Sequence, residues 1–305
     1  MMPALGWLRA RLALGKFKIV ELWLGFFVGV SLLGGDALRD GRVLAILGAI
    51  LVTGIAVIAA TCSLDDITGV RDGVDQANHS NGARWGVAKP ILTGDLAERS
   101  AFSFVRVLGA VGAAAYAVAL ALAWPLPAWL LVTMTAMMVI ALNYSYGLKL
   151  SYHGAGELVI FIGGAGTVFV PYALATRSIS AAVIVSAILV GAWHAQVVVF
   201  SNTNDRAGDR ATQRMTIAAR TSPRGNKIYI ASLFAIVWAT TAVALATHVL
   251  SPWTIAALAP VWGLQLYQLW SGLGRDQWLR ARLAGFRVLR VGILALTLVN
   301  FLAPS

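Results

Sequence analysis

Hydrophobic residues gather along this chain into long runs that alternate with shorter polar segments. A helix needs about 20 apolar residues to cross the hydrocarbon core of a bilayer. Runs that fit this requirement fall at 17–35, 43–63, 101–123, 127–147, 156–175, 179–201, 228–249, 253–272 and 284–303. The pattern predicts an all-α polytopic membrane protein with nine transmembrane helices, in a single transmembrane domain over residues 1–305.

The lysines and arginines test this partition, because cytoplasmic loops carry most of the basic residues of a membrane protein. With the N-terminus inside, the inner segments collect most of them, whereas the outer loops hold Arg39, Arg42 and Arg177. The bias predicts a multi-pass protein of the cytoplasmic (inner) membrane of a bacterial-type cell. Its N-terminus is expected inside and its C-terminus outside.

Composition supports the same class of protein. Hydrophobic residues make up 59% of the chain and charged residues 12%, against roughly a quarter charged in soluble domains. The net charge of +11 is therefore assigned to topology and to lipid headgroups, and no nucleic-acid partner is expected. Cys62 is the sole cysteine, which excludes an internal disulfide and a metal site built on thiolates.

Two of the inner segments are long and polar, at about 64–100 and 202–227. Together they hold eight of the thirteen carboxylates, namely Asp65, Asp66, Asp72, Asp75, Asp95, Glu98, Asp205 and Asp209. Each segment follows an even-numbered predicted helix. The arrangement indicates two similar halves that each contribute one acidic segment to a shared site.

The second acidic segment predicts a magnesium site. On a helix, Asn202, Asp205 and Asp209 fall within an arc of about 60 degrees. Converging carboxylate and amide oxygens suit a hard cation that keeps part of its shell for water and phosphate. The alternative is a polar pattern that only solvates the end of a helix.

The first acidic segment carries Asp65, Asp66, Asp72 and Asp75 within eleven residues, and these carboxylates repel one another unless a cation or protons neutralise them. Two glycines in the segment, Gly69 and Gly73, predict that any helix here is frayed or broken. Two facing acidic segments are what a diphosphate held between magnesium ions requires.

Basic residues lie among these acids, and their simplest role is to set topology. A departing diphosphate gains charge, however, so cations placed around it lower the barrier to its release. Arg71, Lys149 and Arg210 are the candidate diphosphate ligands. Lys149 is the strongest of these because it is the sole basic residue of its short loop, just after 143–146.

In these features the chain resembles the UbiA superfamily of intramembrane prenyltransferases, which have nine helices and acidic motifs after the second and sixth. It is most similar to the menaquinone-pathway branch, the dihydroxynaphthoate prenyltransferases. In the first motif of that branch, N-D-x-x-D-x-x-x-G-x-D, the matching residues are Asp66, Gly73 and Asp75. The second motif is matched by residues 202–209. Three shorter motifs are also echoed, namely G-x-G-E by residues 154–157, T-L-A-x-R by 216–220 and R-P-x-x-S-G by 89–94. Two positions depart from the pattern, since Asp65 replaces an asparagine and Gly69 replaces the middle aspartate.

The resemblance implies a UbiA-like bundle with a central cavity and Mg²⁺ as cofactor. The implied reaction transfers a prenyl group from an isoprenoid diphosphate donor to a small aromatic acceptor, a quinone precursor or natural product. The implied magnesium ligands are Asp66, Asp75, Asn202, Asp205 and Asp209, with Asp65 or Asp72 as substitutes for the missing aspartate. Asn143, Tyr144, His194 and Glu157 are candidates to contact the acceptor or the cationic intermediate, although such residues more often only pack.

Two other functions remain open from the sequence. A UbiA-type terpene cyclase uses the same scaffold, but the cation then attacks a double bond of its own chain. A membrane transporter also uses acidic broken helices. Its sites lie near the bilayer midplane, whereas these aspartates are expected at helix ends on one face.

Overall fold

The computed structural model describes residues 4–79 and 88–302, and within these two ranges the regular secondary structure is helical. The elements are α1 (Ala4–Leu14), α2 (Glu21–Ser31), α3 (Gly35–Arg39), α4 (Gly41–Arg71), α5 (Val74–His79), α6 (Glu98–Ala123), α7 (Ala128–Leu142), the 3₁₀ turn η1 (Leu150–His153), α8 (Gly156–Thr176), α9 (Ala181–Asn204), α10 (Arg206–Ala211), α11 (Ile217–Arg220), α12 (Pro223–Ala246), α13 (Trp253–Leu269), the π-helical turn η2 (Trp270–Gly274) and α14 (Trp278–Leu302).

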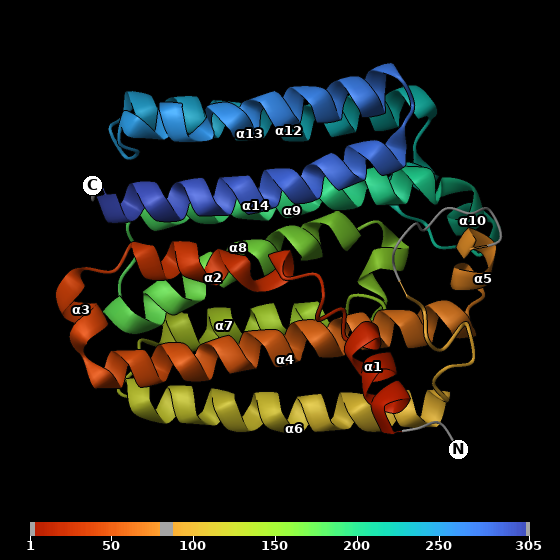
Figure 1. Ribbon diagram of the computed structural model, residues 1–305, viewed down its shortest axis with the longest axis horizontal. Helices are drawn as coiled ribbons and strands as arrows, with labels where there is room; N and C mark the ends of the chain where they lie inside the picture. The colour runs from red at the N-terminus through yellow and green to blue at the C-terminus, as the bar shows by residue number, and fades with distance from the viewer. Residues whose placement is uncertain (1–3, 80–87, 303–305) are drawn as a thin grey trace.

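The long helices lie side by side in successive rows (Figure 1). Helix α6 forms one edge, followed by α4 and α7, then α2 and α8, then α9 and α14, with α12 and α13 at the other edge. Burial of the helices fits this order. Of an apolar 18-residue stretch in each helix, 78% is buried in α9 but only 17% in α6. Helix α9 therefore lies in the interior, and the apolar outer face of α6 is available to lipid.

Each of the nine predicted runs contains a helix, but nine membrane spans are not confirmed. Six helices in the described ranges are long and apolar enough to cross a membrane: α4, α6, α8, α9, α12 and α14. The other three are shorter, with 11 residues in α2, 15 in α7 and 17 in α13. Helix α2 is short because Lys16 takes a left-handed φ of 56°, and the chain turns there before the helix begins at Glu21.

The first acidic segment is more helical than its glycines predicted. Helix α4 continues through Gly69 to Arg71, so Asp65 and Asp66 lie on a helix and not in a loop. Gly73, with a φ of +75°, makes the turn into α5. A Cβ on Gly69 would lie 2.8 Å from the Asp75 carboxyl group, so this glycine lets α5 fold back closely onto α4.

Local caps fix the segments that follow α9. The Thr216 hydroxyl accepts a hydrogen bond from the Ala219 amide at the start of α11. Ser222 does the same for the Gly225 amide at the start of α12, where Pro223 occupies the first helical turn. These caps satisfy amides that have no partner within their own helix. They hold the chain after the second acidic segment in a defined course.

Candidate active site

The two acidic segments meet at one end of the bundle, where α5 lies beside α10 (Figure 1). The Asn78 side-chain amide donates a hydrogen bond to Asp209 Oδ1 over 3.1 Å. The contact is close, because a Cβ on Gly208 would lie 2.1 Å from Asn78 Oδ1. A second link joins Arg214 Nη2 to Asp65 Oδ1 at 3.8 Å. Segments that are distant in sequence therefore line one site.

Two lysines neutralise the centre of the first acidic segment, Lys89, which is buried, and Lys16, which is partly exposed. Lys89 Nζ lies 2.7 Å from Asp66 Oδ1 and 2.9 Å from Asp75 Oδ2. Lys16 Nζ reaches the other oxygen of Asp66, Oδ2, over 2.7 Å. Asp66 and Asp75 are 1% and 2% exposed, and buried carboxylates of this kind need such partners. Neither lysine was predicted from the sequence to belong to the site.

The remaining acids of the first segment face the loop between α7 and α8. Ser145 donates a hydrogen bond to Asp65 Oδ1 over 2.6 Å. Lys149 Nζ contacts Asp72 Oδ2 at 2.6 Å, and both side chains are partly exposed. Lys149 therefore lies at the edge of the site, bound to one of its aspartates.

The second acidic segment is held by polar neighbours. Asp209 is buried and accepts a further hydrogen bond from the Thr216 hydroxyl over 3.3 Å. Asn202 Nδ2 donates to Glu157 Oε1 over 2.8 Å, and Glu157 Oε2 is buried without a hydrogen-bond partner in the part of the chain that the structure describes. Asp205 Oδ1 accepts from Asn204 Nδ2 over 3.1 Å.

Arg214 is the cation that lies between the two segments. Its side chain is buried, with the guanidinium carbon 5.4 Å from the Tyr152 ring centre. Burial lowers the pKa of Arg214, but the charge of Asp65 and its neighbours outweighs burial and leaves the pKa above its ordinary value. Its Nε has no hydrogen-bond partner among residues 4–79 and 88–302. A charged, incompletely bonded guanidinium is suited to bind an anion.

Tyr144 and Tyr152 remain neutral phenols around Arg214. Burial raises the pKa of both hydroxyls well above the usual value. The two rings therefore supply aromatic walls and hydroxyl donors without adding negative charge beside the acidic segments.

Magnesium fits the residues of this site by the chemistry of the donors. Oxygen atoms of Asp66, Asp75, Asn202, Asp205 and Asp209 come from two segments that touch, and hard cations favour such ligands. Within the described ranges no three His, Cys, Asp or Glu side chains already form a metal-binding group. Lysines hold the first carboxylates in place instead.

Several predicted residues have other partners. Arg71 pairs with Glu98 over 2.5 Å, and Arg210 donates to the backbone carbonyls of Ala219 and Thr221 over 2.6 and 3.2 Å. His194 lies in the packed interior, where its ring nitrogens contact the carbonyl oxygens of Val190 and Glu21. The Asn143 side chain donates to the Val139 carbonyl of α7 and accepts from the Leu148 amide of the following loop. Of the residues predicted from the sequence to form the site, these four are not brought to the acidic segments.

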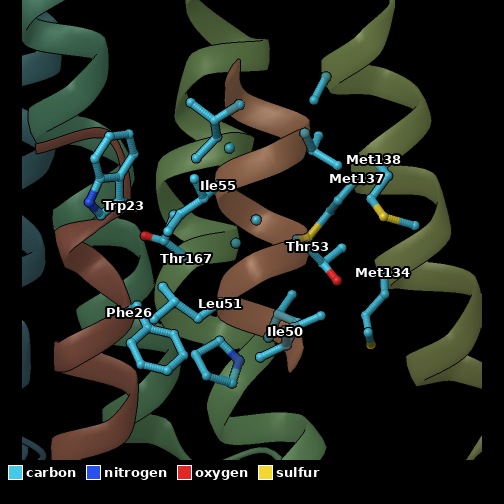
Figure 2. A pocket seen from close by; sticks show the side chains of 18 of the residues that line it. Trp23, Phe26, Ile50, Leu51, Thr53, Ile55, Met134, Met137, Met138 and Thr167 are labelled. Carbon is cyan, nitrogen blue, oxygen red and sulfur yellow. The ribbon is translucent and has the colours of Figure 1, made fainter. Parts of the chain in front are cut away.

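An apolar pocket lies between α2, α4, α7 and α8 (Figure 2). Trp23 and Phe26 stand on one side, and Met134, Met137 and Met138 stand on the other. On α4 the lining ends at Ile58, which is seven residues before Asp65 and so about 10 Å along the helix. The pocket therefore begins roughly two helical turns from the carboxylates.

A family model agrees with this geometry. The model of the UbiA prenyltransferase family matches residues 22–289. The chain belongs to the UbiA prenyltransferase family. Lys16 and α1 lie outside the part that the UbiA model matches. None of the curated proteins that were compared matches this chain significantly.

Solved structures share the UbiA fold at low sequence identity. A structure described as that of digeranylgeranylglyceryl phosphate synthase is similar with a TM-score of 0.66 and 12% identity, covering 97% of this chain and 99% of that one. A UbiA homologue from Archaeoglobus fulgidus bound to DMAPP and Mg²⁺ gives a TM-score of 0.60 at 12% identity, covering 94% and 98%. Its complex with GPP and Mg²⁺ gives 0.59 at 14% identity, covering 94% and 99%.

Proposed function

We propose that this protein transfers a prenyl group from an isoprenoid diphosphate to an acceptor in a magnesium-dependent reaction. The observation that carries the proposal is the meeting of two acidic segments at the end of the bundle, roughly two turns of α4 from an apolar pocket. A prenyl diphosphate has the matching shape, with a charged head and an apolar tail. The Archaeoglobus fulgidus neighbour, bound to such diphosphates and Mg²⁺, supports the assignment.

Magnesium would be held by Asp66, Asp75, Asn202, Asp205 and Asp209, and it would neutralise charge that develops on the diphosphate. Lys89, Lys16 and Arg214 lie around these residues. The lysine ammonium groups beside Asp66 would add positive charge near the diphosphate oxygens. Arg214 offers the forked donor that phosphate groups favour.

The reaction follows from this placement. The carbon–oxygen bond of the donor breaks, and diphosphate leaves with the bonding electrons while the cations of the site stabilise its charge. The allylic cation that forms stays beside aromatic and apolar walls, where water is excluded. A carbon atom of the acceptor attacks the cation, a carbon–carbon bond forms, and the acceptor loses a proton.

The acceptor we propose is a small aromatic molecule, a quinone precursor or natural product, as in the menaquinone-type branch. Tyr144 and Tyr152 line the space beside Arg214, and their rings can stack on a planar ring. Glu157 Oε2, buried beside Asn202, can accept a hydrogen bond from an acceptor hydroxyl. The orientation we propose places the acidic end of the bundle at the cytoplasmic face.

Product analysis tests the proposal. Purified protein is incubated with magnesium and geranylgeranyl diphosphate, with and without dihydroxynaphthoate. We expect diphosphate release and a prenylated aromatic product only when the acceptor is present. A hydrocarbon formed without an acceptor would instead identify a terpene cyclase, and an intact donor in every mixture would reject the proposed chemistry.

A further inference from the structure

A second apolar cavity lies beside the first, between α4, α6 and α7. Small residues of α6 open it, including Gly109, Gly112 and Ala113. A Cβ added to Gly109 would meet nothing within 4 Å. Helix α6 packs chiefly on α4, whereas α7 packs on α8 and α4. The space between α6 and α7 is therefore a groove on the lipid-facing side of the bundle.

Tyr116 stands at the boundary between the two cavities. It lines both of them, together with Val57 of α4 and Met138 of α7. Its hydroxyl lies 3.0 Å from the Thr135 hydroxyl, which joins α6 to α7 across the groove. Hydroxyl groups in apolar surroundings keep such a partner because no water replaces it. The pair therefore closes the side wall of the pocket below the acidic segments.

The groove between α6 and α7 is lined by apolar residues, so it fits an apolar chain. From Tyr116 the second cavity extends beside Leu108, Val139 and Leu142, toward the end of α6 that carries the Arg71–Glu98 pair. A chain that runs from the acidic segments into the first pocket has two outcomes at Tyr116. It ends inside the pocket when the wall is closed, or it passes into the groove when the wall is open.

We propose that Tyr116, held by Thr135, sets the length of prenyl chain that the protein accepts, and that the groove between α6 and α7 takes the terminal isoprene units of longer donors. The inference rests on the proposed function and names a determinant of its specificity. It assigns a role to α6, which contributes no residue to the acidic site apart from its first turn.

Donor competition tests this role. The ratio of kcat/KM for geranylgeranyl diphosphate over geranyl diphosphate is measured for the wild type, Tyr116→Ala, Tyr116→Phe and Thr135→Val. Val118→Ala is the matched control, because Val118 lies on the same helix as Tyr116, is exposed and lines neither cavity. Uncleavable thiodiphosphate analogues of both donors give the same comparison by calorimetry, so that binding is measured apart from turnover.

We expect Tyr116→Ala to raise the ratio on the order of tenfold, as for other apolar pockets that gain or lose part of a side chain. Tyr116→Phe and Thr135→Val should raise it less, and Val118→Ala should leave it unchanged. An unchanged ratio in a folded Tyr116→Ala protein would overturn the proposal. If that variant does not fold, unchanged ratios in both Tyr116→Phe and Thr135→Val would overturn it.

Donor consumption and binding by the wild-type protein separate the proposed function from the proposed length determinant. If it consumes and binds the donors while the variants keep the wild-type ratio, the length determinant is wrong and the proposed function stands. If it neither consumes nor binds any prenyl diphosphate, the proposed function fails and the length determinant fails with it.

Discussion

At the scale of single residues, the site depends on which cation each carboxylate contacts. Asp66 has a lysine on each oxygen, Lys89 from the segment after α5 and Lys16 from the segment before α2. Both ammonium groups lie 2.7 Å from the carboxylate. Because an unpaired buried charge is costly, the lysines keep the first acidic segment in place until another cation binds.

Arg214 and Arg71 provide a direct comparison of two arginines. Arg214 is buried between the acidic segments, and Arg71 is half-exposed and paired with Glu98. Arg214→Gln should weaken binding of an uncleavable prenyl diphosphate analogue on the order of 30-fold or more, because a buried charged partner is lost. Arg71→Gln should leave the affinity close to wild type. Calorimetry measures both, and equal effects of the two changes would contradict the placement of Arg214 at the diphosphate.

At the scale of helices, the sequence predicted where each helix lies better than where it begins and ends. Each apolar run holds a helix, since a backbone in lipid must satisfy its own hydrogen bonds. The start of α2 depends on the left-handed turn at Lys16, which hydropathy does not report. The course of α4 through Gly69 depends on its close approach to Asp75, which is a tertiary contact.

The residues of the candidate site likewise divide into those that the sequence predicts and those that depend on tertiary contacts. Asp66, Asp75 and Asp209 could be predicted because acidic residues are rare in such a chain and cluster in two segments. Lys16 could not, because it contacts Asp66 across 50 residues and resembles an ordinary topogenic lysine. Arg214 was not predicted as a site residue, because its burial beside Tyr152 follows from tertiary packing.

The close packing of α5 on α4 predicts the effect of restoring the aspartate at position 69. Gly69→Asp places a side chain where a Cβ alone would lie 2.8 Å from the Asp75 carboxyl group. We expect a loss of about 1–3 kcal/mol of stability from overpacking. Gly48→Ala on the same helix is the control, because nothing lies within 4 Å of an added Cβ there. Thermal unfolding in detergent measures both, and equal stabilities would refute this packing account.

At the scale of the whole molecule, the fold places charge at one end and apolar space beneath it. Helices α1, α5 and α10 lie at the same end of the bundle, and α14 finishes at the opposite end (Figure 1). Similarity to a solved structure reaches a TM-score of 0.66 at 12% identity. The arrangement of helices is therefore retained although few of the side chains are.

Membrane orientation is predicted at this scale. In a Cys62→Ser background, Ser178→Cys lies in the exposed turn between α8 and α9, and Arg224→Cys lies in the exposed first turn of α12. A maleimide that cannot cross membranes should label Ser178→Cys in intact cells and Arg224→Cys only after permeabilisation. The reverse pattern would place the acidic end of the bundle outside and contradict the predicted topology.

The central claim is that one aspartate from each acidic segment is needed at the same diphosphate. Magnesium-dependent release of diphosphate from geranylgeranyl diphosphate, with acceptor present, is measured for the wild type, Asp66→Asn, Asp209→Asn and the control Glu98→Gln. We predict that each aspartate change lowers the rate on the order of 10²- to 10³-fold, as for other lost electrostatic contacts, and that Glu98→Gln keeps it. A folded Asp66→Asn or Asp209→Asn protein with the full wild-type rate would contradict the account.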